Sequence, residues 1–344
     1  MRSLMRGCGG GGLGGTFERR FLKLLPVRRV EDDSTPFLAV YIATEGPSTM
    51  IPMATVQRAV ILAAGLGTRM LPASKSVPKE MLPVVDRPAI QYAVEEAVAA
   101  GIEHIVIVLA PDRVSIKEHF GGGSRIEAIA RQRMNAKLTA QVLEPEQLAN
   151  FTFVQQLEPL GTGHAIQQAR EQLEEEPFAL LFPDDIILGE HSCTAQLIEV
   201  YENCNAAAVI AVEPISQKEI PQYGIVDPIG PNNPTQLRGI VEKPSVDTAP
   251  SDLGVVGRYV LGPSIFRQFD KLKQGKGGEL QFTDALSGQI EEGEAVFAYH
   301  FEGQRYDAGR PVGAIAASVA HALDREELRE DLLTHLANLL PLEQ

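Results

Sequence analysis

Residues 58–64 read RAVILAA and lead directly into GLGTRMLPASKSVPK at 65–79. The first stretch is a continuous apolar run that ends at a glycine, a pattern typical of a strand buried on both faces of a parallel sheet. The second stretch places Gly65 and Gly67 just after that strand. In open α/β sheets, ligands bind at the carboxyl ends of the strands. Together the two stretches predict an α/β fold with a ligand site in the loop after its first strand.

This loop is rich in groups that bind phosphate. Its two glycines let the backbone approach a ligand with N–H groups directed at an anion. Arg69 can hold phosphate oxygens with its planar fork, and Lys75 and Lys79 add point charges. A P-loop would need Gly-Lys-Ser/Thr, which is absent, and Met70 stands where the dinucleotide-binding fingerprint needs a third glycine. The spacing favours a polyphosphate site of another kind, with an ordinary strand–loop connection carrying incidental cations as the alternative.

Strand-like and helix-like stretches alternate along the rest of the chain. Residues 88–101 carry one apolar stripe at helical spacing, with Pro88 suited to the first turn and Gly101 to the end of the helix. We expect strands over 103–110, 151–156, 178–185 and 206–214, β-type segments over 223–262, and helices near 124–137, 163–175, 311–323 and 325–340. The alternation predicts a Rossmann-like, mixed and mainly parallel sheet flanked by helices.

A change of composition near residue 53 divides the chain. Residues 1–52 combine a glycine-rich run, a cluster of basic residues and proline-containing turn formers. We predict a disordered extension there, or a stretch upstream of a more natural start at Met50 or Met53. The ordered domain is expected over 53–323, followed by a C-terminal helix within 324–344.

Composition limits the classes of partner. The 344 residues carry a formal net charge of −14 at pH 7, which argues against a nucleic-acid binder with a broad basic surface. A local cluster of arginine and lysine can still bind a small anion. Three cysteines without a C-x-x-C pair favour a reducing, cytoplasmic compartment. No apolar run reaches the ~18 residues of a membrane span, so we expect neither nucleic acid nor membrane as a partner.

Two later stretches carry candidate ligand groups. Asp184 and Asp185 follow the expected strand FALLFP, and adjacent acids in such a turn suit Mg²⁺, which prefers carboxylate, phosphate and water oxygens. A solvated turn explains them equally well. Gly161 and Gly163 open an expected helix, whose N–H groups can bind an anion or a base edge. Helix capping is the equal alternative there.

The loop is also part of a longer signature. LAAGLGTRMLPASKSVPKEMLPVVDRPAIQY at 62–92 closely resembles the signature of bacterial UTP–glucose-1-phosphate uridylyltransferases, and it follows the G-x-G-T-R-x-x-P…P-K pattern of sugar nucleotidyltransferases. The resemblance runs from about Gln57 to about Leu336. It implies the nucleotide-diphospho-sugar transferase fold, with a nucleotide-binding half at about 56–190 and a sugar-binding half at about 206–310. It also implies that UTP and α-D-glucose 1-phosphate give UDP-glucose and pyrophosphate, with Mg²⁺ as cofactor, in a homodimer or homotetramer.

The same resemblance implies roles for individual residues. The catalytic residues would be Arg69 and Lys79, which bind the triphosphate, and Lys243, which aligns the attacking sugar phosphate. The nucleotide-binding residues would be Ala63, Ala64, Gly65, Leu66, Gly67, Thr68, Gln156, which reads the base, and Gly161. The sugar-phosphate-binding residues would be Asp185, Tyr223, Gly224, Glu242, Lys243 and Gly257. The metal ligands would be Asp184 and Asp307.

Two departures from the family pattern keep alternatives open. The family usually has Gly-Leu-Gly-His-Ala after a lysine, whereas this chain has PLGTGHA at 159–165, so a preference for dTTP or another sugar 1-phosphate stays open. The family commonly has Asp-Cys-Gly, a polar residue and lysine, whereas this chain has Asp307-Ala-Gly-Arg310-Pro. A catalytically inactive regulatory relative is a further alternative, although every expected phosphate-binding cation and metal-binding acid is present.

Overall fold

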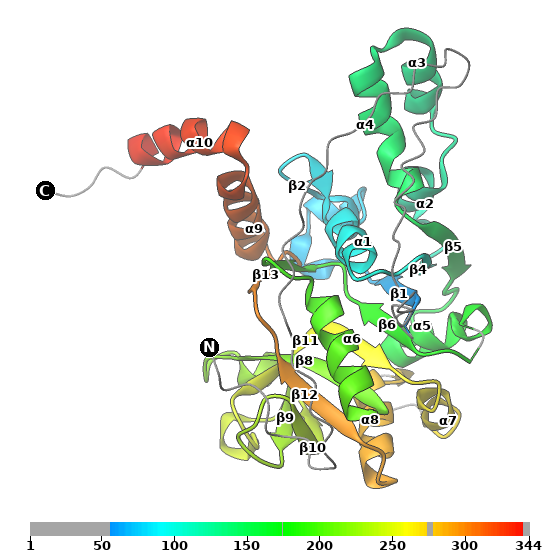
Figure 1. The fold of residues 1–344 in the computed structure, drawn as a ribbon, viewed down its shortest axis with the longest axis vertical. Helices are drawn as coiled ribbons and strands as arrows, with labels where there is room; N and C mark the ends of the chain where they lie inside the picture. Colours follow the sequence, from blue (N-terminus) through cyan, green and yellow to red (C-terminus); the bar gives the residue numbers. More distant parts are fainter. Residues whose placement is uncertain (1–55, 174, 274–277, 340–344) are drawn as a thin grey trace, which may run out of the picture. The chain divides into compact units, whose positions relative to one another are not determined.

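The computed structural model describes residues 56–173, 175–273 and 278–339 (Figure 1). The prediction for residues 1–52 lies outside this part of the chain. The described residues form a nine-stranded sheet with the order β5-β4-β1-β6-β11-β8-β12-β10-β9. Its strands are β1 (Arg58–Ala63), β4 (His104–Leu109), β5 (Asn150–Gln155), β6 (Phe178–Leu181), β8 (Ala208–Pro214), β9 (Gly224–Pro228), β10 (Thr235–Glu242), β11 (Leu253–Leu261) and β12 (Val296–His300).

One half of the sheet is wholly parallel, and the other half is mixed. Strands β5, β4, β1 and β6 are parallel, and Ile61 of β1 lies opposite both Ile107 and Leu181. Strand β11 runs antiparallel between β6 and β8, and β10 runs antiparallel to β12 and β9. The mixed α/β sheet predicted from the sequence is therefore confirmed. Because β1 and β6 are parallel neighbours, the loops that follow them meet at one edge of the sheet.

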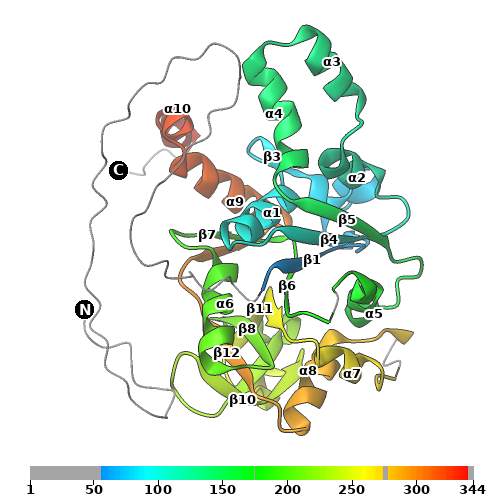
Figure 2. The same cartoon turned by 45° about the vertical axis from the view of Figure 1, so that its right-hand side comes forward.

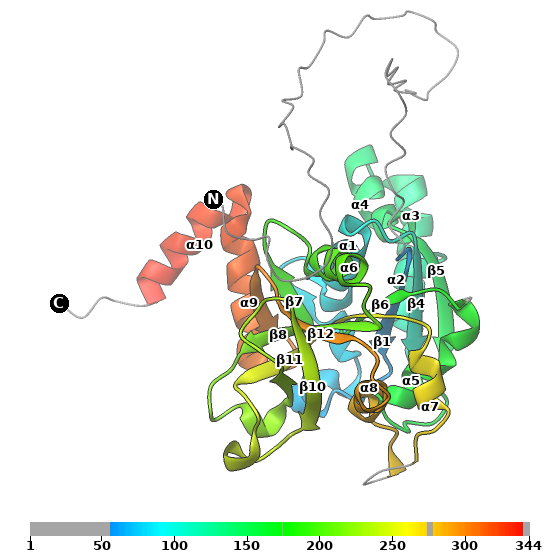
Figure 3. The same ribbon diagram turned by 60° about the horizontal axis from the view of Figure 1, so that its bottom comes forward.

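Helices cover both faces of this sheet (Figure 3). On one face lie α1 (Ala89–Ala99) and α6 (Cys193–Cys204), and on the other lie α5 (Thr162–Gln168), α7 (Ile265–Phe269) and α8 (Phe282–Glu291). In β1, Ile61 packs into the core beneath α1 and α6, whereas its neighbour Val60 packs into the core beneath α5, α7 and α8. Burial on both faces explains why this strand is a continuous apolar run.

The segment between β4 and β5 departs from prediction. One helix was expected near 124–137, but the structure has α3 (Arg125–Arg133) and α4 (Ala136–Gln147), preceded by the unpredicted α2 (Val114–Gly121) (Figure 2). Two capping residues explain the division. Ser124 accepts from the N–H of Glu127 at 3.4 Å, and Asn135 accepts from the N–H of Leu138 at 3.0 Å. Because each cap begins a new helix, Asn135 ends the single expected helix.

The chain returns to the sheet edge through its last elements. Strand β13 (Gln304–Asp307) pairs antiparallel with β7 (Asp185–Leu188), and a small ribbon joins β2 (Pro83–Val84) to β3 (Arg87–Pro88). Helix α9 (Pro311–Asp324) packs its Ala317 against residues of β2 and β7, and α10 (Glu326–Leu339) follows. Both C-terminal helices were predicted from the sequence. Within the described residues, no helix is long and apolar enough to cross a membrane.

Candidate active site

A cavity of about 480 Å³ opens where the loops after β1 and β6 meet. Its walls come from those two loops and from β9, β10, β11, β13 and the start of α8. It brings together most of the residues predicted from the sequence, namely Gly65, Leu66, Gly67, Thr68, Arg69, Lys79, Asp184, Asp185, Tyr223, Gly224, Glu242, Lys243, Gly257 and Asp307. Four predicted residues do not line it: Ala63, Ala64, Gln156 and Gly161.

The loop after β1 folds back on itself through three short 3-10 turns, η1 (Thr68–Met70), η2 (Ala73–Lys75) and η3 (Lys79–Met81). Gly67 has a φ of +66°, and a Cβ there would lie 3.2 Å from the Cβ of Lys79. The Ser74 hydroxyl donates to the Gly67 carbonyl at 2.7 Å and closes the fold. A glycine is needed here for both the left-handed backbone and the close approach. This folding of the loop brings Lys79 beside Gly65 and Gly67, although it lies more than ten residues after them in the sequence.

An ion pair joins this loop to the turn after β6. The Lys79 ammonium donates to Oδ2 of Asp184. Burial alone would raise the pKa of Asp184, but the charge of Lys79 and this hydrogen bond outweigh it, so the pKa is lowered. Burial lowers the pKa of Lys79, and the charges of Asp184 and Glu80 outweigh that effect, so its pKa is raised. Both groups are therefore held in their charged forms.

Asp184 and Asp307 converge on one point, although they lie far apart in the sequence. Pairing of β7 with β13 puts Asp307 opposite Asp185, and the N–H of Ala308 donates to the Asp184 carbonyl at 2.7 Å. A Cβ on Gly309 would lie 2.6 Å from Oδ2 of Asp184 and 3.0 Å from Oδ1 of Asp307. Burial, reinforced by the charges of Asp185 and Asp184, raises the pKa of Asp307.

Two carboxylates around one open point fit a hard divalent cation. No group of three or more His, Cys, Asp or Glu side chains among the described residues could hold a metal by itself. The remaining ligands would then be phosphate oxygens and water, which is the usual arrangement for Mg²⁺ at a nucleotide site. The donor set therefore suits a metal that arrives with a phosphate substrate.

Asp185 differs from its neighbour because both of its oxygens are bound by the protein. Oδ1 accepts from Nε of Arg305 at 2.6 Å, and Oδ2 accepts from the N–H of Gly257 at 2.8 Å. Arg305 also donates to Glu213 at 2.7 Å and to the Tyr223 hydroxyl at 3.3 Å. Asp185 thus joins β11 and β13 and fixes Tyr223. Asp185 also lines the cavity, and its role at the sugar phosphate stays a prediction.

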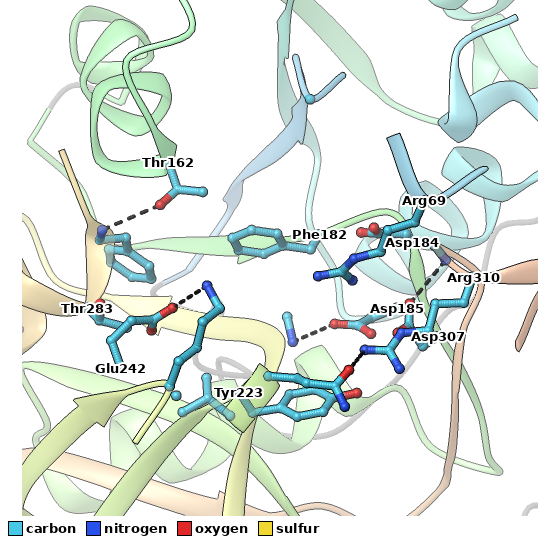
Figure 4. A pocket seen from close by; sticks show the side chains of 18 of the residues that line it. Arg69, Thr162, Phe182, Asp184, Asp185, Tyr223, Glu242, Thr283, Asp307 and Arg310 are labelled. Atoms are coloured by element: carbon cyan, nitrogen blue, oxygen red, sulfur yellow. Dashed lines mark hydrogen bonds and ion pairs between the residues drawn. The ribbon is translucent and has the colours of Figure 1, made fainter. Parts of the chain in front are cut away.

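Tyr223, Glu242 and Lys243 lie on the side of the cavity opposite the phosphate loop. Figure 4 shows Tyr223, Glu242 and Thr283 across from Arg69, Asp184 and Arg310. The Lys243 ammonium lies 2.8 Å from Glu242 Oε1. The backbone of Lys243 is left-handed, with a φ of +46°, and its N–H donates to the Tyr223 carbonyl at 3.0 Å. Such a conformation is costly for a residue with a side chain and is typical of functional sites.

Sequence reasoning missed several residues that line the cavity. The most prominent are Arg305 and Arg310, and Arg310 lies 2.9 Å from Oδ2 of Asp307. Both stand beside Asp307 in the stretch RYDAGR, so their proximity to that acid was the available signal. Phe182 and Tyr259 also line the cavity. They belong to apolar strand segments, and nothing in those segments marks them as facing a ligand.

The chain matches the nucleotidyl transferase family over residues 58–322. This chain belongs to the nucleotidyl transferase family. It is 42% identical to the UTP–glucose-1-phosphate uridylyltransferase of Bacillus subtilis (strain 168), covering 85% of this chain and 100% of that protein. It is 41% identical to UTP–glucose-1-phosphate uridylyltransferase 2 of Staphylococcus saprophyticus, covering 83% of this chain and 99% of that protein.

Solved structures agree with the sequence relatives. UTP-bound UGPase from Acinetobacter baumannii is 38% identical with a TM-score of 0.75, covering 84% of this chain and 100% of that one. UDP-glucose pyrophosphorylase complexed with UDP-glucose is 36% identical with a TM-score of 0.70, covering 78% of this chain and 100% of that one. The fold predicted from the resemblance is therefore confirmed for this nucleotidyl transferase.

Gly257→Ala should disable this nucleotidyl transferase without unfolding it. The added Cβ would lie 2.5 Å from Asp185 Oδ2 and 2.6 Å from Phe182 Cβ, so the turn that carries Asp184 must move. Displacements of this order at an active site cost ~100-fold in rate. We expect such a loss in the rate of pyrophosphate release. Circular dichroism of the same sample would show that the variant is folded. Gly239→Ala in β10 is the control, because a Cβ there meets no atom within 4 Å; similar rates in the two variants would contradict the prediction.

Glu80 is a buried carboxyl beside Lys79 whose two oxygens have no hydrogen-bond partner among the described residues. Burial raises its pKa; the charges of Lys79, at 4.0 Å, and Arg113 partly oppose this effect, and that of Asp184 adds to it. A carboxyl whose pKa is raised on folding stabilises the protein below its ordinary pKa of ~4.3, and this stabilisation is lost as the pH rises through the raised value. At pH values above this raised pKa, the buried charge of Glu80 is therefore destabilising.

Glu80→Gln should raise the melting temperature at neutral pH, because the amide cannot ionise. A gain of ~1 kcal/mol corresponds to about 2–4 °C for a domain of this size. The difference from wild type should shrink as the pH falls toward ~4. Scanning calorimetry across this pH range would measure it, with the exposed Glu118→Gln as control. A difference that stays constant with pH would show that Glu80 is not a destabilising charge.

Proposed function

We propose that this nucleotidyl transferase makes UDP-glucose and pyrophosphate from UTP and α-D-glucose 1-phosphate. The observation that carries the proposal is one cavity holding a glycine loop with two cations, Arg69 and Lys79, two converging carboxylates, and Lys243 on the far side. This arrangement provides places for a triphosphate, a metal and a second phosphate. Relatives at 41–42% identity bear the name of this activity.

The reaction needs no nucleophile from the protein. An oxygen of the sugar phosphate attacks the α-phosphorus of UTP, a new P–O bond forms in line, and the bond to the β-phosphate oxygen breaks to release pyrophosphate. Catalysis then depends on positioning the two phosphates and neutralising their charge. Arg69 and Lys79 bind the triphosphate, and Lys243 orients the attacking phosphate.

Mg²⁺ is the proposed metal, held by Asp184 and Asp307. When bound, it would neutralise phosphate charge and bring the two phosphates together. The protein's own cations act at the same place. Lys79 pairs with Asp184 and Arg310 pairs with Asp307, so each acid has a cation that can reach a neighbouring phosphate oxygen.

Gln156 is the proposed contact to the base, although it lies behind the cavity wall. Its amide nitrogen donates to the Gly161 carbonyl at 3.1 Å and lies 3.0 Å from His164 Nδ1. These contacts use the donors of the amide and leave its carbonyl oxygen to accept from a base N–H. Uracil and thymine both carry that donor at N3, so Gln156 alone would not distinguish UTP from dTTP. The dTTP alternative therefore requires a direct test.

The nucleotide preference is tested by pyrophosphate release with glucose 1-phosphate and Mg²⁺, comparing UTP, dTTP, ATP, GTP and CTP. We expect release with UTP that disappears when EDTA is added and returns with excess Mg²⁺. A preference for dTTP would keep the mechanism and overturn the assigned base. No turnover with any nucleotide, from protein shown to be folded, would favour the inactive regulatory relative.

Lys243→Met should chiefly weaken the use of glucose 1-phosphate. Methionine keeps the length of the side chain and removes the charge that would pair with the sugar's phosphate. We expect the KM for glucose 1-phosphate to rise ~10–100-fold, as lost charge-assisted hydrogen bonds do, while the KM for UTP changes little. Steady-state kinetics with each substrate varied would measure both. A collapse of UTP binding with a normal response to the sugar phosphate would refute the assignment.

The remaining expectations are also proposals for this enzyme. We place the nucleotide-binding half at about 56–190 and the sugar-binding half at about 206–310, and we place the reaction in the cytoplasm. A homodimer or homotetramer is supported by α9, which exposes Val312 at 79% and Ile315 at 64%. Apolar side chains exposed together on one element are typical of subunit contacts.

A further inference from the structure

A buried arginine lies directly behind the turn that carries Asp184. Arg258 of β11 is only 1% exposed. Its guanidinium donates to three carbonyl groups, those of Phe182 at 2.9 Å, Asp185 at 2.6 Å and Gly257 at 2.9 Å. Two of these carbonyls bracket Asp184 in the sequence. The donors of one rigid planar group thus fix both ends of the turn between β6 and β7.

Glu96 of α1 holds this arginine from the other side. Nε and Nη2 of Arg258 donate to its two carboxylate oxygens at 2.8–3.0 Å. Glu96 also accepts from the N–H of Thr194 at 3.1 Å and from its hydroxyl at 2.7 Å. The side chain of Glu96 is only 8% exposed. The two charges therefore form a closed buried pair, anchored to α1 and to the start of α6.

Stability alone does not explain such a pair. Removing two charges from water is costly, and replacing a buried ion pair by apolar residues of similar volume is often neutral or stabilising. The distinguishing feature of this pair is its set of contacts. A bidentate fork constrains direction as well as distance, and here that constraint falls on the backbone around an acid that lines the cavity.

We propose that Arg258 and Glu96 are positioning residues that set the direction of the Asp184 carboxylate for metal binding. Neither touches the cavity; they act through the carbonyls of Phe182 and Asp185. The other side of the turn is held by Arg305, which binds Asp185, and by Ala308, which binds the Asp184 carbonyl. Without the contacts from Arg258, the turn is still held by Arg305 and Ala308, but the direction of the Asp184 carboxylate is no longer fixed. The inference rests on the proposed metal role of Asp184.

The test uses the double variant Arg258→Met/Glu96→Gln in the full chain. Both charges are removed together, so neither is left buried and unpaired, which is the costly case. Glutamine keeps an oxygen that can accept from Thr194. Arg258→Lys is the second variant, because it keeps the charge opposite Glu96 but lacks the planar fork.

Metal binding is the first measurement, with Mn²⁺ as the probe in the presence of saturating UTP, followed by electron paramagnetic resonance. We expect the Kd for Mn²⁺ to rise about tenfold in the double variant and about threefold or more in Arg258→Lys, both shown to be folded by circular dichroism. We expect kcat to fall while the KM for UTP changes less than threefold, because Arg69 and Lys79 are untouched. Should the double variant fail to fold, the Arg258→Lys result decides alone.

Gln268→Met is the matched control. Gln268 is 4% exposed on α7 and donates to Glu292 at 2.7 Å, and no residue of α7 lines the cavity. The Gln268→Met variant should have a lower melting temperature and an unchanged Kd for Mn²⁺. If the folded Arg258 variants bind Mn²⁺ as tightly as wild type, the pair only stabilises the core and the inference is wrong. If wild type binds no Mn²⁺ even with UTP present, the proposed metal site fails, and the inference fails with it.

Discussion

The ion pair between Lys79 and Asp184 is the contact on which the rest of the cavity depends. It exists because β1 and β6 are parallel neighbours, which brings the loops after them to one edge of the sheet. The glycine at 67 lets the first loop fold back so that Lys79 reaches this edge. A charged pair in a partly buried setting fixes both partners in their ionised forms. The same pair leaves a cation and a carboxylate at the point where a phosphate and a metal would meet.

The adjacent acids Asp184 and Asp185 have the same side chain but make different contacts. Asp184 lies in the turn before β7, whereas Asp185 is the first residue of that strand. Asp184 turns toward Lys79 and Asp307 in the cavity, whereas Asp185 turns toward Gly257 and Arg305. Both acids line the cavity, but each oxygen of Asp185 already accepts one hydrogen bond from the protein. A pair of acids in a sequence therefore does not by itself indicate two ligands.

The elements and site residues predicted correctly from the sequence are those marked by residues next to them in the chain. The strand at 58–63 and its phosphate loop are contiguous, so composition and glycine spacing were sufficient to place them. The division between α3 and α4 also had a local signal, because Asn135 caps the start of α4 by accepting from the N–H of Leu138, and the prediction of one helix over 124–137 overlooked it. Arg258 had no such signal, because its partner Glu96 is 162 residues away. The pairing of Asp184 with Asp307 likewise depends on β7 and β13, which only the tertiary fold brings together.

The stretch Ala308-Gly-Arg310-Pro311 connects the second acid, Asp307, to the start of α9. Pro311 occupies the first turn of α9, where a missing N–H costs nothing, and Gly313 lies so close to the Asp307 carbonyl that a Cβ would be 1.9 Å from its oxygen. The helix therefore begins directly on the backbone of the second acid. A cation placed just before the helix, at Arg310, can reach Asp307 at 2.9 Å, whereas the side chain at 311 is a proline ring. The start of α9 thus places the positive charge of Arg310 beside Asp307.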